Sequence, residues 1–98
     1  MNNRGRRKYM QLDDETLTCL AQQGDNPAFD ALLGRYRSYI KQYLLRLIAD
    51  PDAAEDILQD TFIKVYTSIH QYRGEASFKS WLFVITRNSW KNHLRSHQ

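Results

Sequence analysis

Several residue patterns are missing from this chain of 98 residues, and each absence excludes a class of protein. The single cysteine, Cys19, has no partner for an internal disulfide, and no Cys/His cluster has metal-site spacing. No run approaches the roughly 20 apolar residues of a membrane-spanning helix. The glycines are isolated, so there is no glycine-rich phosphate loop. We therefore expect no cofactor, no metal, no membrane insertion and no enzymatic activity, and we predict a reducing cytoplasm as the compartment.

Length and composition indicate one soluble domain. A chain of 98 residues can build a modest core but not two. Hydrophobic residues make up 42% and charged residues 26%, which is ordinary for a globular domain. The first ten residues are basic and lack the apolar core of a signal peptide. We predict a disordered tail over residues 1–10 and one domain over residues 11–96.

The net charge of +3 conceals an uneven distribution. Residues 1–10 contain four cations and no acid, and residues 11–60 contain ten acids and four cations. Residues 61–98 contain six cations and one acid. A basic C-terminal third indicates an anionic partner such as nucleic acid. A basic helical face that is merely solvated explains the charge equally well.

Helix-start signals divide the chain into about four helices. A carboxylate or hydroxyl at the N-cap accepts hydrogen bonds from free backbone N–H groups, and proline is tolerated in the first turn. We expect a short helix ending at Gly24, a second over about 26–49, a third starting at Pro51 and a fourth over about 78–94. The predicted N-caps are Asp13 or Asp14, Asp25, Asp50 and Ser77.

Apolar residues recur at three- and four-residue spacing in these segments, which gives each helix one buried side. No strand pattern competes, so the predicted fold is all-α, a small bundle of about four helices. The predicted inward positions are Phe29, Leu32, Leu33, Tyr36, Ile40, Tyr43, Leu44 and Leu47, then Ala54, Ile57, Leu58, Thr61, Val65 and Ile69, and finally Phe78, Trp81, Leu82 and Ile85.

The last third combines the side chains that bind single-stranded nucleic acid: flat rings for stacking, cations for phosphates and amides for base edges. Aromatic residues near cations are also common in plain packing, so this composition favours nucleic-acid binding without requiring it. The candidates are Tyr72, Phe78, Phe83 and Trp90 for stacking, Arg73, Lys79, Arg87, Lys91 and Arg95 for phosphates, and Asn88 and Asn92 for base edges.

The order and spacing of these motifs resemble region 2 of bacterial sigma factors of the sigma-70 family. Residues 52–66, DAAEDILQDTFIKVY, resemble region 2.2. Residues 72–82, YRGEASFKSWL, with Ile85, Arg87-Asn88 and residues 93–95, resemble regions 2.3 and 2.4. Together with Gly24-Asp25 and Ala28-Phe29, the pattern is similar to the extracytoplasmic-function (ECF) group. The resemblance covers roughly residues 20–95.

The resemblance implies two partners. In that family, region 2.2 docks on the clamp helices of the β′ subunit of RNA polymerase core. Polar groups around an apolar centre suit such a helix-on-helix contact, although a solvated acidic face remains the alternative. Asp60 stands where family members often carry Glu. The polymerase-binding residues implied are Asp56, Gln59, Asp60, Ile63 and Lys64.

Regions 2.3 and 2.4 of the family open the promoter −10 element and hold its non-template strand. The resemblance implies one flipped base in a pocket of the 72–78 loop and the start of region 2.4, with Tyr72 and Asn88 as principal residues. We expect Trp81 to pack, and Trp90 to stack on DNA or shield the helix. The DNA-binding residues implied are Tyr72, Arg73, Gly74, Ser77, Phe78, Lys79, Arg87, Asn88, Lys91, Asn92 and Arg95.

Two further expectations follow from the resemblance, and one hypothesis competes with it. Region 4, which reads the −35 element, is absent, so we expect an excised domain or a truncated product. The family also implies an anti-sigma factor as a candidate partner. The competing hypothesis is a helical module that binds only protein, and binding of single-stranded DNA distinguishes the two.

Overall fold

The computed structural model describes residues 8–96, and within them every regular element is helical. The elements are α2 (Asp14–Gln22), α3 (Asn26–Ile48), α4 (Pro51–Ser68), the 3-10 helix η1 (Ile69–Gln71) and α5 (Phe78–Ser96). No helix of this described part is long and apolar enough to span a membrane. Because every regular element of residues 8–96 is helical, the all-α prediction is confirmed.

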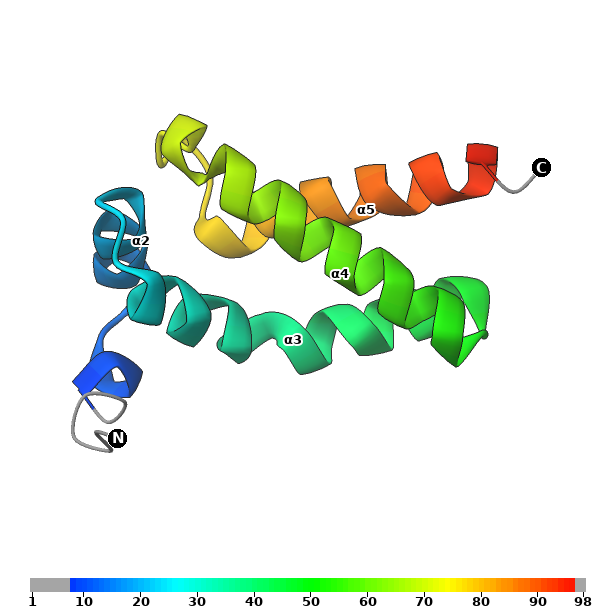
Figure 1. Cartoon of the computed structure of the whole chain (residues 1–98), viewed down its shortest axis with the longest axis horizontal. Coiled ribbons are helices and arrows are strands. Elements are labelled where there is room, and N and C mark those ends of the chain that lie inside the picture. Colours follow the sequence, from blue (N-terminus) through cyan, green and yellow to red (C-terminus); the bar gives the residue numbers. More distant parts are fainter. Residues whose placement is uncertain (1–7, 97–98) are drawn as a thin grey trace.

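The three long helices form the body of the molecule (Figure 1). Helix α4 packs against both α3 and α5, and α2 packs near the start of α3. Helix α2 also contacts η1 and α5, although those elements are far from it in sequence. This places α2 beside the connection between η1 and α5, at residues 72–77.

All four predicted N-caps form. The carboxylate of Asp13, rather than that of Asp14, accepts from the Thr16 N–H at 2.8 Å. Asp25 caps α3, and Asp50 accepts from two N–H groups at the start of α4. The Ser77 hydroxyl accepts from the N–H of the third residue of α5 at 3.1 Å. These bonds satisfy donors that have no partner inside the helix, so local sequence determined where each helix begins.

The core follows the predicted stripes, with one exception. Every inward residue predicted between Ala54 and Ile69 is buried. Leu47, however, is 38% exposed, and its prediction was wrong. The inward row at the end of α3 runs through Ile40, Leu44 and Ile48 at four-residue spacing, so Leu47 lies one position round the helix from it.

The structure also differs in part from the prediction of a disordered tail over residues 1–10. Residues 8–10 belong to a helical turn over residues 8–11, ahead of α2. Residues 1–7, which make up the rest of that prediction, lie outside the described residues.

Candidate nucleic-acid interface

One exposed surface runs along α4 and is named here the acidic ridge; it consists of Asp56, Gln59, Asp60 and Ile63. Ile63 is 62% exposed, and Tyr66, one turn further, is 54% exposed. The ridge thus presents two carboxylates, an amide and an apolar side chain on one side of a helix. Four of the five predicted polymerase-binding residues share it.

The side chain of Gln59 is oriented by a charge network that crosses from α3 to α4. Its Nε2 donates to Glu55 at 3.2 Å. The same carboxylate accepts from Arg37 at 2.9 Å and from Lys41 at 3.1 Å. Hydrogen bonds from Gln59, Lys41 and Arg37 lower the pKa of Glu55 to about 2. Glu55 therefore stays ionised, and its ion pairs connect α4 to α3 beside the acidic ridge.

The α4–α5 groove is a hollow of about 640 Å³ between those helices. Its lining is basic and amide-rich, with one indole. Lys64, predicted to bind polymerase, lines this groove together with residues 68 and 71, and it lies one turn beyond Asp60 of the acidic ridge. The other lining residues are Trp81, Val84, Ile85, Asn88, Ser89, Lys91, Asn92 and Arg95.

The loop hollow, of about 680 Å³, lies between α2 and the connection that precedes α5. One side consists of residues 72–79, with Arg73 and Lys79 as cations. Tyr36 of α3 also lines it. The opposite side is α2, which contributes Asp14, Glu15, Thr18, Cys19 and Gln22.

Residues 72–77 are folded back on themselves. The Tyr72 hydroxyl donates to the Ala76 carbonyl, and Gly74 has φ +79°, a conformation that L side chains rarely adopt. The Tyr72 ring packs edge-on against Phe78 with centroids 6.1 Å apart. Burial, and then the charges of Glu15 and Asp14, raise the pKa of Tyr72, so its hydroxyl keeps the proton it donates.

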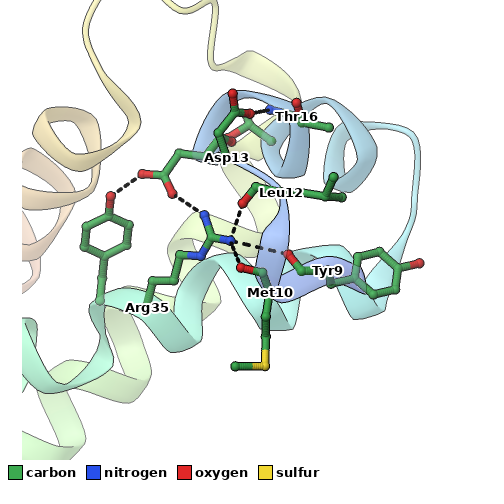
Figure 2. A network of polar contacts seen from close by, with 9 residues as sticks. Tyr9, Met10, Leu12, Asp13, Thr16 and Arg35 are labelled. Carbon is green, nitrogen blue, oxygen red and sulfur yellow. Dashed lines mark hydrogen bonds and ion pairs between the residues drawn. The ribbon is translucent and has the colours of Figure 1, made fainter. Parts of the chain in front are cut away.

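A polar network holds the acidic side of the loop hollow (Figure 2). The Arg35 guanidinium donates to Asp14 at 2.9 Å and to the backbone carbonyls of Tyr9, Met10 and Leu12. The Tyr36 hydroxyl donates to the other oxygen of Asp14. Burial and this bond raise the pKa of Tyr36 to about 12. Asp14 is thus committed to Arg35 and Tyr36, and the network attaches residues 9–12 to α3.

The structure divides the predicted DNA-binding residues between the two hollows. Tyr72 and Asn88, expected in one pocket, line different hollows, because Asn88 lies almost three turns along α5. Arg87 is exposed and lines neither. The loop hollow receives Tyr72, Arg73, Gly74, Ser77, Phe78 and Lys79, and the α4–α5 groove receives Asn88, Lys91, Asn92 and Arg95.

Three aromatic residues have packing roles. Phe78 is only 4% exposed, which argues against the stacking role suggested for it. Phe83 packs edge-on against Tyr43, with centroids 5.3 Å apart. The Nε1 of Trp90 is buried without an acceptor among the described residues. That burial favours shielding over stacking for Trp90.

Lys79 is already engaged within the protein. Its Nζ lies 5.5 Å from the centroid of the Tyr39 ring on α3, a cation–π distance. Tyr39 itself is 64% exposed. Lys79 is exposed at the rim of the loop hollow, so its charge stays accessible to a phosphate.

The sequence did not indicate that α2 lines a site. Asp14, Glu15 and Gln22 were not among the predicted site residues, and the contacts that bring Gln22 to the loop join residues 47 and 50 positions apart. Local spacing carries no signal for such contacts. Among residues 8–96, no group of three or more His, Cys, Asp or Glu side chains has the arrangement of a metal site.

Comparisons with known proteins identify the family and the fold of the chain. Residues 32–98 match the family described as Sigma-70 region 2. The chain is 42% identical over 84 residues to the ECF RNA polymerase sigma-E factor of Haemophilus influenzae, covering 86% of this chain and 44% of that protein. It is 38% identical to the RNA polymerase sigma-H factor of Pseudomonas aeruginosa, with the same coverage. The chain therefore spans less than half the length of these curated relatives.

A solved structure of similar sequence resembles most of the described fold. It is the NMR structure of an engineered region 2 of sigmaE in complex with GTAAAA. The TM-score is 0.81 and the sequence identity 32%, over 88% of this chain and 90% of that one.

Proposed function

The chain belongs to the Sigma-70 region 2 family, and we propose that it is a transcription-initiation domain that holds promoter DNA and binds RNA polymerase core. The observation that carries the proposal is the likeness to a sigmaE region 2 in complex with GTAAAA. The basic groove and the loop hollow supply the side chains that single-stranded DNA requires.

We assign the α4–α5 groove to the non-template strand of the −10 element. Lys64, Lys91 and Arg95 would neutralise phosphates along it. Asn88 and Asn92 lie one turn apart on α5 and would contact base edges, since amides both donate and accept. Because several cations share the groove, binding should weaken steeply as salt rises.

We assign the flipped base to the loop hollow. Unstacking a base costs a few kcal/mol, so a pocket has to return that energy through ring contacts and hydrogen bonds. Tyr72 offers a ring at the pocket, while Arg73 and Lys79 offer cations at its rim. Asn88 then acts on a neighbouring base in the groove, since it lines a different hollow.

We assign the acidic ridge to the β′ clamp helices of the polymerase. An exposed Ile63 among Asp56, Gln59 and Asp60 gives an apolar centre with a polar surround, which suits helix-on-helix docking. The bonds from Arg37 and Lys41 to Glu55 connect α4 to α3 beside this face. An anti-sigma factor that covered the same ridge would compete with polymerase.

A titration with single-stranded DNA tests the first assignment. The full chain, alone and with core polymerase, is titrated against labelled GTAAAA by fluorescence anisotropy. Asn88→Ala should weaken binding about tenfold, the order expected for one base-edge contact. Asn26→Ala, an exposed asparagine outside both hollows, is the matched control. If GTAAAA and other −10-like strands fail to bind even with polymerase present, the chain is a module that binds only protein.

A charge reversal tests the ridge. Asp60→Lys should weaken binding to core polymerase while leaving the helical circular dichroism spectrum intact. Asp30→Lys introduces the same charge change at an exposed site on α3 and should have no effect. Equal affinity of the Asp60→Lys variant and the unaltered chain would remove the ridge from the interface.

A further inference from the structure

Gln22 of α2 attaches the start of the 72–77 connection to the body of the protein. Its Nε2 donates to the Ile69 carbonyl at 2.9 Å and to the Tyr72 carbonyl at 2.8 Å. A glutamine amide nitrogen carries two hydrogens, so one side chain supplies a donor for each carbonyl. Both donors of Gln22 are therefore committed to the connection.

The two carbonyls lie where the chain leaves regular structure. Ile69 begins η1 and Tyr72 follows it, so the 3-10 helix ends between them. The Ile69 carbonyl also accepts from the Tyr72 N–H at 3.2 Å, which closes the 3-10 turn. The Tyr72 carbonyl lies beyond the end of that helix and needs a donor from elsewhere. Ile69 itself is 2% exposed, so its position is fixed by the core. Gln22 thus links a fixed point in the core to the first residue of the connection.

A second bond holds the middle of the connection. The hydroxyl of Tyr72 donates to the Ala76 carbonyl, so the residue whose carbonyl Gln22 holds also closes the connection on itself. Movement of Tyr72 would move both its ring and the Ala76 carbonyl. Together with the packing of the Tyr72 ring against Phe78 and Trp81, the two bonds in series constrain the loop hollow on the side that residues 72–77 form.

We propose that Gln22 is a positioning residue for base selection: it acts through Tyr72 and keeps the loop hollow in the shape that discriminates one flipped base from another. The inference rests on the proposed function and adds to it a residue of α2, outside the motifs that carried the resemblance. Discrimination depends on holding contact groups within a fraction of an ångström, whereas phosphate attraction tolerates movement. Loss of the two Gln22 hydrogen bonds should therefore reduce selectivity between bases more than it reduces affinity for DNA.

Matched variants separate the donors from the shape of the side chain. Gln22→Met keeps the length of the side chain and removes both donors. Gln22→Glu keeps its shape and places a carboxylate against two carbonyls. Tyr72→Phe keeps the ring and removes only the bond to Ala76. Gln23→Met makes the same exchange at the exposed neighbouring position and serves as the control.

The measurement is the ratio of affinities for GTAAAA and its single-base variants, by fluorescence anisotropy with the full chain and core polymerase. The unaltered chain should prefer one base at one position at least. In Gln22→Met that preference should fall about tenfold, the order of one base-edge contact. Affinity for the weakest oligonucleotide and the salt dependence should stay unchanged. Tyr72→Phe should reduce the same preference, and Gln23→Met should reduce none.

A measurement without DNA accompanies the titration. In Gln22→Met, NMR order parameters of the backbone amides at residues 73–76 should fall from about 0.85 toward about 0.6, the range of flexible backbone. The order parameters of α3 and α4 should not change. This pattern locates the effect in the connection and excludes general unfolding.

The outcomes are distinguishable. An undiminished preference in Gln22→Met overturns the inference and leaves the proposed function in place. An equal loss of affinity for every oligonucleotide also overturns it, because Gln22 would then only stabilise the fold. Failure of the unaltered chain to bind any of the strands overturns the proposed function and the inference together.

Discussion

The ring centroids of Tyr72 and Trp81 lie 5.0 Å apart, and the ring planes meet at an angle of 41°. Tyr72 lines the loop hollow and Trp81 lines the α4–α5 groove, so this contact joins the two candidate sites. Trp81 also packs against Phe78 at 5.9 Å. The packing role expected of Trp81 is thus observed, and the same residue forms the border between the hollows.

Replacement of Trp81 should affect both hollows. Trp81→Ala removes an indole that is half-buried, and the unfolding free energy should fall by about 2 kcal/mol, below the range for fully buried aromatic residues. Urea unfolding measures this loss. The affinity for GTAAAA should also fall, because Tyr72 loses its neighbour. An unfolding free energy equal to that of the unaltered chain would show that the ring contact contributes nothing.

Arg35→Lys should detach residues 9–12 from α3. A lysine ammonium is a compact charge and cannot reproduce the planar set of donors that contacts Asp14 and three carbonyls. We expect a loss of about 1.5–3 kcal/mol of unfolding free energy, the range for hydrogen bonds to a charged group. Hydrogen exchange at the Leu12 amide should accelerate while α4 stays protected. Arg46→Lys, on an exposed part of α3, is the control.

Because of Glu55, the stability of the folded protein should depend on pH in the acidic range. Its pKa is lowered from 4.5 to about 2 in the folded protein, so the charged form is favoured by folding. Its contribution is therefore present above the unfolded pKa and is lost as the pH falls from 4.5 toward about 2. Urea midpoints of the unaltered chain and Glu55→Gln should converge over that range. A constant difference between them would contradict the assignment. The pKa of Asp13 is also lowered, but Asp13 is present in both proteins, so its contribution cancels in the difference between them.

Ala49→Gly should stabilise the protein. Ala49 ends α3 with φ +53°, in the left-handed region. An L residue there is disfavoured by roughly 1–2 kcal/mol, and glycine removes that strain. Because glycine also gains entropy when unfolded, the net increase should be about 0.5 kcal/mol. Urea unfolding measures it, and Ala53→Gly inside α4 should lower stability instead. A decrease for Ala49→Gly would contradict the prediction.

Features set by neighbouring residues were predicted correctly. A cap such as Asp25 or Asp50 acts on N–H groups two or three residues away, so the sequence contains the whole interaction. Apolar spacing of three and four residues determined which side of α4 is buried. The prediction that Leu47 is buried was wrong because the inward row ends on Ile48. The packing of the last turn decides which of the two residues faces inward.

Features set by contacts between distant segments were not predicted. Lys64 was assigned to polymerase binding by its place in the motif, and only the structure shows that it also lines the groove, because α5 packs beside that row of α4. Tyr72 and Asn88 were placed in one pocket, and the length of α5 separates them. No sequence pattern in residues 11–23 indicated that α2 lines the loop hollow.

The sequence by itself determined the helices, their caps, the buried rows and the family, because each depends on residue types at fixed local spacing. Only the tertiary structure decided which side chains share a hollow. It placed α2 against the 72–77 connection, committed Asp14 to Arg35 and Tyr36, and brought Gln22 to two carbonyls 47 and 50 residues away. Such contacts depend on how whole helices pack, which no local spacing encodes.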